Sequence, residues 1–305
     1  MNFKERPLNS SLIKRFLYRG DERELLCPYQ IYAVDIAKTH HYQTESMLKG
    51  SYFETLCLGR GANNQVTDDL PRKKLSKKQI IENHKLAAQD KPPYKGDKTL
   101  DQVRIERQAQ IFKDLCHKYQ VTVTHANTQV RIIVPWHRNT EVLLSMEFDI
   151  FPTAIITKDG LRLAIIDIKL TTDVESSFGE YCWGRPEFMD ITQALMYLYG
   201  VKKLAANIDM NPHMRDLLTR PAINLIEQNQ IDFFYWVFSY KKIDNKLIKV
   251  TWDQTREQEL HETINKAVSL IDYYEAMGWP TKPHYSLCKT CPVLECIHRQ
   301  TIQEI

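Results

Sequence analysis

Three apolar runs in the middle of the chain predict a β-sheet. They are "QVRIIVPW" (129–136), "VLLSMEFDIFPTAII" (142–156) and "LRLAIIDIKLTT" (161–172), and turn residues separate them. The third run is apolar at nearly every position, so both of its faces should be covered and it should be a central strand. Two further runs, 231–242 and 247–253, predict a hairpin around Asp244-Asn245.

Helical spacing of apolar residues is found on both sides of these strands. Residues 8–60 are mostly of helical character, and Asn9, Ser10 or Ser11 could cap a helix that runs through Leu12 and Phe16. The order of helices and strands predicts an α/β or α+β layer fold, and we expect an α/β core. Further helices are predicted at 100–118 (apolar at Val103, Ile111, Phe112 and Leu115), 187–201, 209–229 and 254–278.

We expect a single domain over residues 1–305, because the length suits one large domain or a core with elaborations. Residues 61–98 are polar and basic, which predicts a loop or a helical insertion. The expected parts are N-terminal helices (8–60), a basic helical insertion (61–118), a catalytic core (119–253) and a C-terminal helix with a cysteine-rich segment (254–305).

The composition is that of an ordinary water-soluble chain, with 43% apolar and 26% charged residues. No apolar run is long enough to cross a membrane and "MNFKERPLNSS" is unlike a signal peptide, so we expect a cytoplasmic protein without membrane contact. The net charge is only +3, so any affinity for nucleic acid has to come from local patches. The basic run of Arg72, Lys73, Lys74, Lys77 and Lys78 could contact phosphates or form a solvated loop.

The predicted central strand carries an acid and a base, Asp167 and Lys169, which share one face because side chains alternate along a strand. Counting outward from the turn "TKDG" (157–160) places Asp149 beside Asp167 and Ile168. Two carboxylates at such a site repel each other, and a divalent cation such as Mg²⁺ relieves the repulsion. The lysine could then orient or deprotonate a water or hold a phosphate, which suits phosphodiester hydrolysis. The alternative is a buried Asp–Lys ion pair without chemistry.

"MEFDIF" followed by "AIIDIKLTT" resembles the core of PD-(D/E)XK nucleases, which share a restriction-endonuclease-like fold. The resemblance implies a mixed central sheet flanked by helices, with Asp149 as first acid and Asp167 and Lys169 as the (D/E)xK pair. About 24 residues downstream, "DITQALMYLYG" resembles the QxxxY motif of the RecB-like branch, with Gln193 and Tyr197 on one helical face. In that branch the helix flanks the active site and contacts DNA or steadies the lysine.

Upstream, "KGSYFETLCLG" (49–59) resembles the segment that carries the early helix acid of this branch. Glu54 would be that acid and Gly50 would allow close approach, whereas the alternative for Glu54 is an acid on a helix surface. The resemblance implies that Mg²⁺ or Mn²⁺ is bound at Glu54, Asp149, Asp167 and Ile168.

The cysteines have an uneven distribution. "LCKTCPVLEC" contains Cys288, Cys291 and Cys296, and Cys27 lies far upstream in "LLCPYQIYAV". This arrangement resembles the iron–sulfur clasp of AddB and of CRISPR-associated RecB-like exonucleases, which implies a [4Fe–4S] cluster that ties the chain ends together. Four thiolates can also hold Zn²⁺, and a further alternative is that these are unrelated buried cysteines. The remaining cysteines, Cys57, Cys116 and Cys182, lack ligand spacing and are expected to be structural.

Taken together, the motifs predict a metal-dependent DNA nuclease, an exonuclease of DNA replication, recombination or repair, with DNA and replication or recombination proteins as partners. If the source is viral, it would act in the host cytoplasm. Two alternatives stay open: a catalytically silent DNA-binding or scaffold module of the same fold, and an endonuclease within a larger complex.

Overall fold

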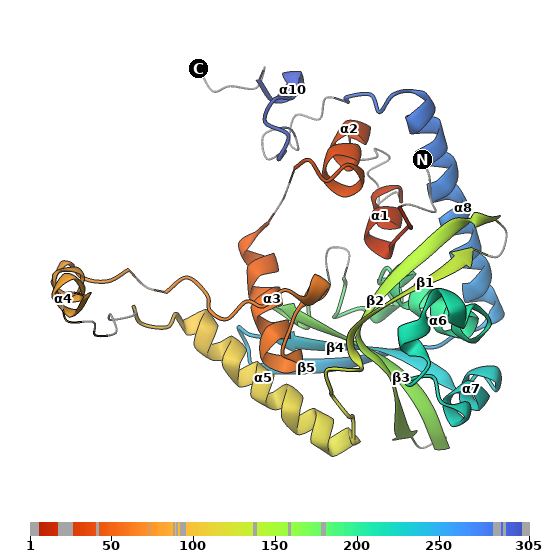
Figure 1. The fold of residues 1–305 in the computed structure, drawn as a ribbon, viewed down its shortest axis with the longest axis horizontal. Helices are drawn as coiled ribbons and strands as arrows, with labels where there is room; N and C mark the ends of the chain where they lie inside the picture. Colours follow the sequence, from red (N-terminus) through yellow and green to blue (C-terminus); the bar gives the residue numbers. More distant parts are fainter. Residues whose placement is uncertain are drawn as a thin grey trace.

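The computed structural model describes residues 6–17, 27–40, 43–72, 74–87, 89, 91, 96–136, 139–157, 160–177, 181–282, 288 and 291–300. A five-stranded sheet in the order β1-β2-β3-β4-β5 forms the centre, and helices flank both of its faces (Figure 1). The predicted α/β class and the central sheet with flanking helices are confirmed. The strands are β1 (Thr128–Trp136), β2 (Asn139–Thr157), β3 (Gly160–Thr171), β4 (Ile231–Ser239) and β5 (Asp244–Val250).

The sheet is mixed. Strands β1, β2 and β3 follow one another antiparallel, β4 runs parallel to β3, and β5 returns antiparallel to β4. The parallel step requires a long crossover, which contains α6 (Thr192–Leu204) and α7 (Arg220–Glu227). The middle of β3, from Leu163 to Ile168, is buried, as its continuous apolar sequence predicted.

The β4–β5 hairpin turns earlier than predicted. Ser239 pairs with Asp244, so the turn lies at 240–243, and Asp244 and Asn245 belong to β5. The left-handed position is taken by Ile243, with φ of 51°, rather than by the Asp-Asn pair that the sequence favoured.

Helices α1 (Ser10–Arg15), α6, α7 and α8 (Gln254–Ala276) cover one face of the sheet. The predicted cap of α1 is confirmed, because the side chain of Asn9 accepts a hydrogen bond of 2.8 Å from the main-chain N–H of Leu12. Gly200 of α6 lies directly against Met146 of β2, where a Cβ atom would collide with the methionine side chain. The glycine therefore allows the C-terminal half of α6 to pack closely on β1 and β2.

The long helix α6 begins later than predicted, at Thr192 rather than near residue 187. A 3₁₀ turn at Pro186–Phe188 precedes it, and Asp190 accepts a 2.9 Å hydrogen bond from the N–H of Thr192. The predicted helix over 209–229 is divided in the same way into 3₁₀ turns at Ala205–Met210 and Pro212–Met214 and the short α7.

The opposite face of the sheet is covered by α3 (Glu45–Leu58) and α5 (Leu100–Tyr119). Phe112 of α5 packs edge-on against Trp236 of β4, with ring centroids 5.9 Å apart. The predicted apolar stripe of α5 is only partly correct: Val103 is 49% exposed, whereas polar Gln102 and Gln108 are buried. These glutamines hydrogen-bond to groups outside their own helix, which allows the helix to bury them. Helix α5, the last part of the predicted insertion over 61–118, packs on the sheet.

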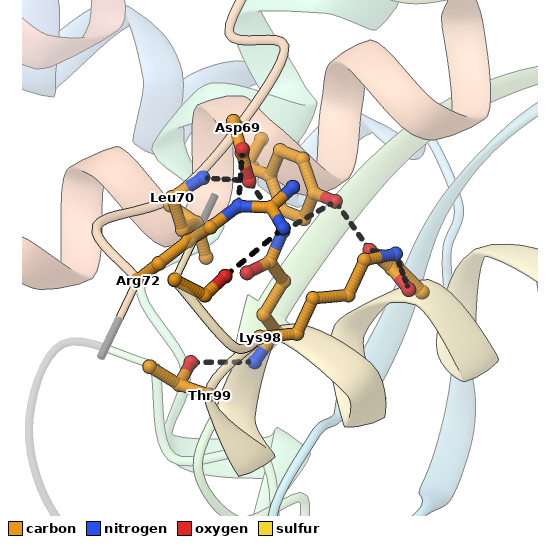
Figure 2. Close-up of polar contacts among 9 residues, drawn as sticks. Asp69, Leu70, Arg72, Lys98 and Thr99 are labelled. Carbon is orange, nitrogen blue, oxygen red and sulfur yellow. Dashed lines mark hydrogen bonds and ion pairs between the residues drawn. The ribbon is translucent and has the colours of Figure 1, made fainter. Parts of the chain in front are cut away.

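The part that does stand apart is an arm, whose described residues are 71, 72, 74–87, 89, 91 and 96–98, with α4 (Lys77–Ala87) far from the sheet (Figure 1). Its two ends meet, since Arg72 contacts Asp69 at 2.8 Å and donates a 3.2 Å hydrogen bond to the carbonyl of Gly96 (Figure 2). Gln102 of α5 donates to the same aspartate, and Lys98 pairs with Glu106 at 2.7 Å. The base of the arm is therefore fixed to α5 by polar contacts.

Two segments from opposite parts of the sequence lie together. Helix α2 (Pro28–Ile31) and the π-helix Tyr32–Ile36 lie near the C-terminal segment with α10 (Ile297–Gln300), as Figure 1 shows. Ala33, Cys291 and Val293 form a small apolar cluster between them. Across the described ranges, no helix combines the length and the apolar character needed to span a membrane.

Candidate active site

Strands β2 and β3 diverge where the two predicted acids lie. Their pairing runs from Thr157 opposite Gly160 to Ile150 opposite Ile166, with a shift of register on the way. Beyond that point, the N–H of Ile168 donates a hydrogen bond of 2.8 Å to Asp149 Oδ2 rather than to a main-chain carbonyl of β2. The side chain of Asp149 is therefore inserted between the two strands, beside Ile168 as the counted register predicted.

Asp167 and Lys169 lie on the same face of β3 and contact each other. Lys169 Nζ is 2.5 Å from Asp167 Oδ2, and the carboxylate is 2% exposed whereas the lysine is 26% exposed. The lysine side chain therefore links a buried acid to solvent.

Helix α6 supplies the two residues of the predicted QxxxY motif. Gln193 Nε2 donates to Asp167 Oδ1 at 2.9 Å and lies 3.3 Å from the hydroxyl of Tyr197. Tyr197 in turn donates to the main-chain carbonyl of Glu147 at 2.6 Å, and its ring packs on Phe148 with centroids 4.7 Å apart. The motif therefore joins Asp167 on β3 to the backbone of β2 at the point where the two strands part.

Glu54 reaches the site from α3, on the other side of the sheet. Its Oε2 accepts the N–H of Ala62 at 3.3 Å, and Gly61 lies beside it so closely that a Cβ would be 3.0 Å from the same oxygen. The predicted role of Gly50 in close approach is wrong, because the space next to that glycine is open. Gly61 fills that role, in a loop that follows the end of α3.

Mutual repulsion and burial perturb the acids of this site. Burial raises the pKa of Asp149 well above its ordinary value, and the charges of Asp167 and Glu54 add to the rise. Burial also raises the pKa of Glu54, against the opposing charge of Lys169. For Lys169 burial disfavours the ammonium form, but the carboxylates of Asp167 and Asp149 outweigh it and raise the pKa of the lysine. Lys169 is therefore a cation shared by several acids.

Two contributors to the site escaped the sequence analysis. Gln129 of β1 donates its side-chain N–H to Asp149 Oδ1 at 3.1 Å, from a backbone with φ of 48°. That conformation is uncommon for a residue with a side chain and occurs often at functional sites. Glu147 accepts the N–H of Asn63 at 2.6 Å and raises the pKa of Glu54. One signal in the sequence could have indicated Glu147: it lies two positions before Asp149 on the same predicted strand, and alternate strand positions share a face.

The donor set fits a hard divalent cation in its chemistry. Glu54, Asp149 and Asp167 offer carboxylate oxygens, the ligands that Mg²⁺ and Mn²⁺ prefer. Burial is the main cause of the raised pKa of Glu54 and of Asp149, and the charge of Asp167 adds to the rise in both. Two of these acids already have partners in the protein. Asp167 contacts Lys169 and accepts a hydrogen bond from Gln193, and Asp149 accepts hydrogen bonds from two N–H groups. Accordingly, among the described residues no three His, Cys, Asp or Glu side chains are arranged as metal ligands, and the predicted cation remains a prediction.

The four cysteines of the predicted clasp share one region. Burial raises the pKa of the Cys291 thiol, and charges on Cys27, Cys296 and Cys288 raise it further, which requires all four to be near one another. Cys27 Sγ accepts the N–H of Lys282 at 3.3 Å across 255 residues of sequence. The two chain ends therefore meet here, while the cluster itself remains a prediction.

Comparisons with known proteins show the fold alone. No family model and no curated protein matches the chain. Among solved structures, a protein named "Putative exonuclease" from Eubacterium rectale matches with a TM-score of 0.53 and 14% sequence identity, over 99% of this chain and 90% of that one. The chain thus shares its overall α/β fold with that protein.

Proposed function

We propose that the protein is a metal-dependent DNA nuclease of the PD-(D/E)XK type, in its RecB-like branch, and that it acts as an exonuclease. The proposal rests on one observation above all. Asp149 and Asp167 meet where β2 and β3 diverge, and Lys169 contacts the second acid from the same strand. A protein named "Putative exonuclease" has a similar fold, which also supports a nuclease activity.

In the proposed reaction Glu54, Asp149 and Asp167 would hold Mg²⁺ or Mn²⁺, next to the main chain at Ile168. The cation supplies positive charge for the phosphoryl oxygens and makes water more acidic. Lys169 enters as an ammonium group, because the neighbouring carboxylates raise its pKa, so it can hold a phosphate oxygen or orient the attacking water. Gln193 and Tyr197 fix the orientation of Asp167 relative to β2.

A role in DNA replication, recombination or repair belongs to the same proposal, with DNA and proteins of those processes as partners. We also propose that Cys27, Cys288, Cys291 and Cys296 hold a [4Fe–4S] cluster, with Zn²⁺ as the alternative. The meeting of the chain ends at these cysteines supports a shared metal group.

A catalytically silent DNA-binding or scaffold module is the second candidate. The contact between Lys169 and Asp167 favours it, since this ion pair already neutralises the acid without a cation. The two candidates differ in whether DNA is cut, so one experiment separates them.

The test is cleavage of end-labelled single- and double-stranded DNA and of circular plasmid, with Mg²⁺, Mn²⁺ or EDTA. We expect linear DNA to be shortened from an end in the presence of cation and circular DNA to stay intact. Asp167→Asn should abolish cleavage, whereas Asp114→Asn, at an exposed site on α5, should not. Cleavage by pure Asp167→Asn protein would refute the assignment. DNA binding without cleavage would support the scaffold, and cut circular DNA would indicate an endonuclease.

A further inference from the structure

A cavity beside the candidate active site has the properties of a nucleotide subsite. Its volume is about 540 Å³, and it lies between the loop after α3, the start of β1 and the 3₁₀ turns after α6. Two arginines, Arg60 and Arg131, and two histidines, His125 and His213, line it, with Asp216 as the one carboxylate among the described residues that line it. A cavity of this size can enclose a nucleotide.

The cavity is joined to the active site through one side chain. Gln129 lines the cavity and donates to Asp149 Oδ1 at 3.1 Å. Arg60 and Asn64 of the lining belong to the loop whose N–H groups at Ala62 and Asn63 bind Glu54 and Glu147. A ligand in the cavity would therefore be adjacent to the acids without occupying their place.

Arg60 shapes the cavity and brings positive charge to it. Its Nη2 donates to the carbonyl of His125 at 2.7 Å and to the carbonyl of Thr128 at 2.5 Å, and its Nη1 lies 3.0 Å from His125 Nε2. Its Nε is buried without a hydrogen-bond partner in the described part of the chain, so the second N–H of Nη1 is the one that a phosphate would meet. A guanidinium group can only donate, so His125 accepts at Nε2 and carries its proton on Nδ1. The histidine thus retains one further N–H for a ligand.

Arg131 provides the second guanidinium group. Its side chain is exposed, its Nε donates to Ser145 Oγ at 2.9 Å, and no described residue binds its two terminal nitrogen atoms. His213 Nε2 lies 2.8 Å from the main-chain carbonyl of Arg131, so it donates there and adjoins the arginine. A planar guanidinium held at one nitrogen presents its other N–H groups as a fork that suits phosphate oxygens.

The remaining wall is apolar. Ile133, Leu217 and Met210 line it, and Met210 is 45% exposed although it is a large apolar side chain. A sugar or base could rest on this wall while its phosphate contacts the arginines, because thioether side chains adapt to flat partners.

We propose that this cavity binds one nucleotide unit of the nucleic-acid strand next to the cleaved bond and holds it by its phosphate through Arg60 and Arg131. This deepens the nuclease function and rests on it for the identity of the strand. The phosphate is either a terminal monophosphate or an internal phosphodiester, and both present negatively charged non-bridging oxygens to the guanidinium groups.

The test is binding of 3′-fluorescein oligonucleotides, with a 5′-phosphate or a 5′-hydroxyl, measured by fluorescence anisotropy in EDTA over a range of salt concentrations. The variants are Arg131→Gln, Arg131→Lys and the control Arg215→Gln. Arg215 carries the same charge nearby but pairs with Asp209 at 2.9 Å and is absent from the described lining. Circular dichroism and thermal melts verify that each variant is folded.

We expect Arg131→Gln to weaken binding about tenfold and to lower the slope of log affinity against log salt by about 1, as the loss of one phosphate contact does. Arg131→Lys should restore part of the affinity, and Arg215→Gln should behave like the wild type. If the 5′-phosphate is the ligand, removing it and introducing Arg131→Gln should have non-additive effects on the affinity. If an internal phosphodiester is the ligand, the affinity should be the same with a 5′-phosphate and with a 5′-hydroxyl.

Wild-type affinity and salt slope in folded Arg131→Gln protein would overturn the subsite, and so would a wild-type protein that binds no oligonucleotide. Cleavage by the wild type is measured separately. If the wild type cleaves DNA and Arg131→Gln binds oligonucleotides as the wild type does, the nuclease function stands and the subsite is refuted. If binding depends on Arg131 but the wild type never cleaves DNA, the subsite stands and the nuclease function is refuted.

Discussion

Gln193 Nε2 donates a hydrogen bond of 2.9 Å to Asp167 Oδ1, while Lys169 contacts the other oxygen of the same carboxylate. The two contacts approach the acid from different elements, one from α6 and one from β3. Asp167 is thereby held in one orientation, and the amide of Gln193 determines which oxygen remains for the lysine.

The first prediction concerns Gln193 and Tyr197, the two residues of the QxxxY motif on α6. Gln193→Ala should lower the rate of metal-dependent cleavage by about 10–100-fold, as the loss of a group that orients a metal ligand commonly does. Tyr197→Phe should cost about 1–3 kcal/mol of the free energy of unfolding, because the carbonyl of Glu147 loses its 2.6 Å donor. Cleavage rates and thermal melts measure the two effects.

The control for both variants is Gln258→Ala, because this glutamine of α8 is exposed and bonds only to the exposed Glu262 among the described residues. An unchanged cleavage rate in Gln193→Ala, together with an unchanged free energy of unfolding in Tyr197→Phe, would mean that α6 merely packs on the sheet.

The second prediction concerns pH and the metal-free protein. Burial and the charges of Asp167 and Glu54 raise the pKa of Asp149, so the folded state holds its proton more tightly than the unfolded state does. The stability from this proton is fully present below the unfolded pKa, about 3.9, and is lost as the pH rises through the folded value. In EDTA, the free energy of unfolding should therefore fall over that interval.

Asp149→Asn should flatten this pH dependence and stabilise the metal-free protein at neutral pH. The new amide can keep the N–H of Ile168 as donor, while the amide of Gln129 turns over to accept. Urea unfolding at a series of pH values compares the two proteins, and an identical slope in both would contradict the assignment of the charge repulsion to Asp149.

The third prediction concerns the cysteines at the chain ends. Protein purified without oxygen should contain iron and matching sulfide, and Cys27→Ser or Cys288→Ser should remove both and lower Tm by roughly 4 °C or more. Cleavage should fall only as folding is lost. If the protein contains zinc and no sulfide, the cysteines hold Zn²⁺ and the iron–sulfur assignment is wrong. If freshly prepared protein contains no metal, both assignments are wrong.

The controls are Cys57→Ser and Cys116→Ser, which should retain the metal. Both side chains are buried, and burial raises the pKa of the Cys116 thiol to about 12. Such a group stays protonated at neutral pH, whereas a metal ligand must be a thiolate.

The fourth prediction concerns the base of the arm in Figure 2. Gln102 is 1% exposed and donates to Asp69 at 2.5 Å and to Tyr52 at 3.4 Å. Gln102→Ala should cost about 1–3 kcal/mol, because buried partners lose their hydrogen bonds, and should speed proteolysis within 72–96. Gln110→Ala, at an exposed position of the same helix, should change stability by about 0.5 kcal/mol or less. Equal proteolysis of both variants would show that Gln102 does not secure the arm.

Much of the sheet could be predicted because its signals are local. The continuous apolar sequence of β3 and the turn before it determined both the central strand and the position of Asp149. Gln193 and Tyr197 followed from helical spacing alone. The cap of α1 at Asn9 is equally local, since it involves residues three positions apart.

The parts that could not be predicted depend on contacts between distant segments. The loop that binds Glu54 and Glu147 does so through main-chain N–H groups, which leave no mark on residue type. Gln129 takes a backbone conformation that only its tertiary setting enforces. Helix α5 buries Gln102, whose hydrogen-bond partner Asp69 lies outside the helix, whereas the adjacent apolar Val103 is 49% exposed.

The meeting of Arg72 with the carbonyl of Gly96 at 3.2 Å also has a consequence for how this chain can change. Because the arm leaves and rejoins the body at one place, its length is decoupled from the geometry of the sheet. The junction is therefore a natural position for deletions, for grafted domains or for new chain ends in a circularly permuted protein. A short turn that joins residue 72 to residue 96 should leave the core able to fold and keep Glu54, Asp149 and Asp167 in place.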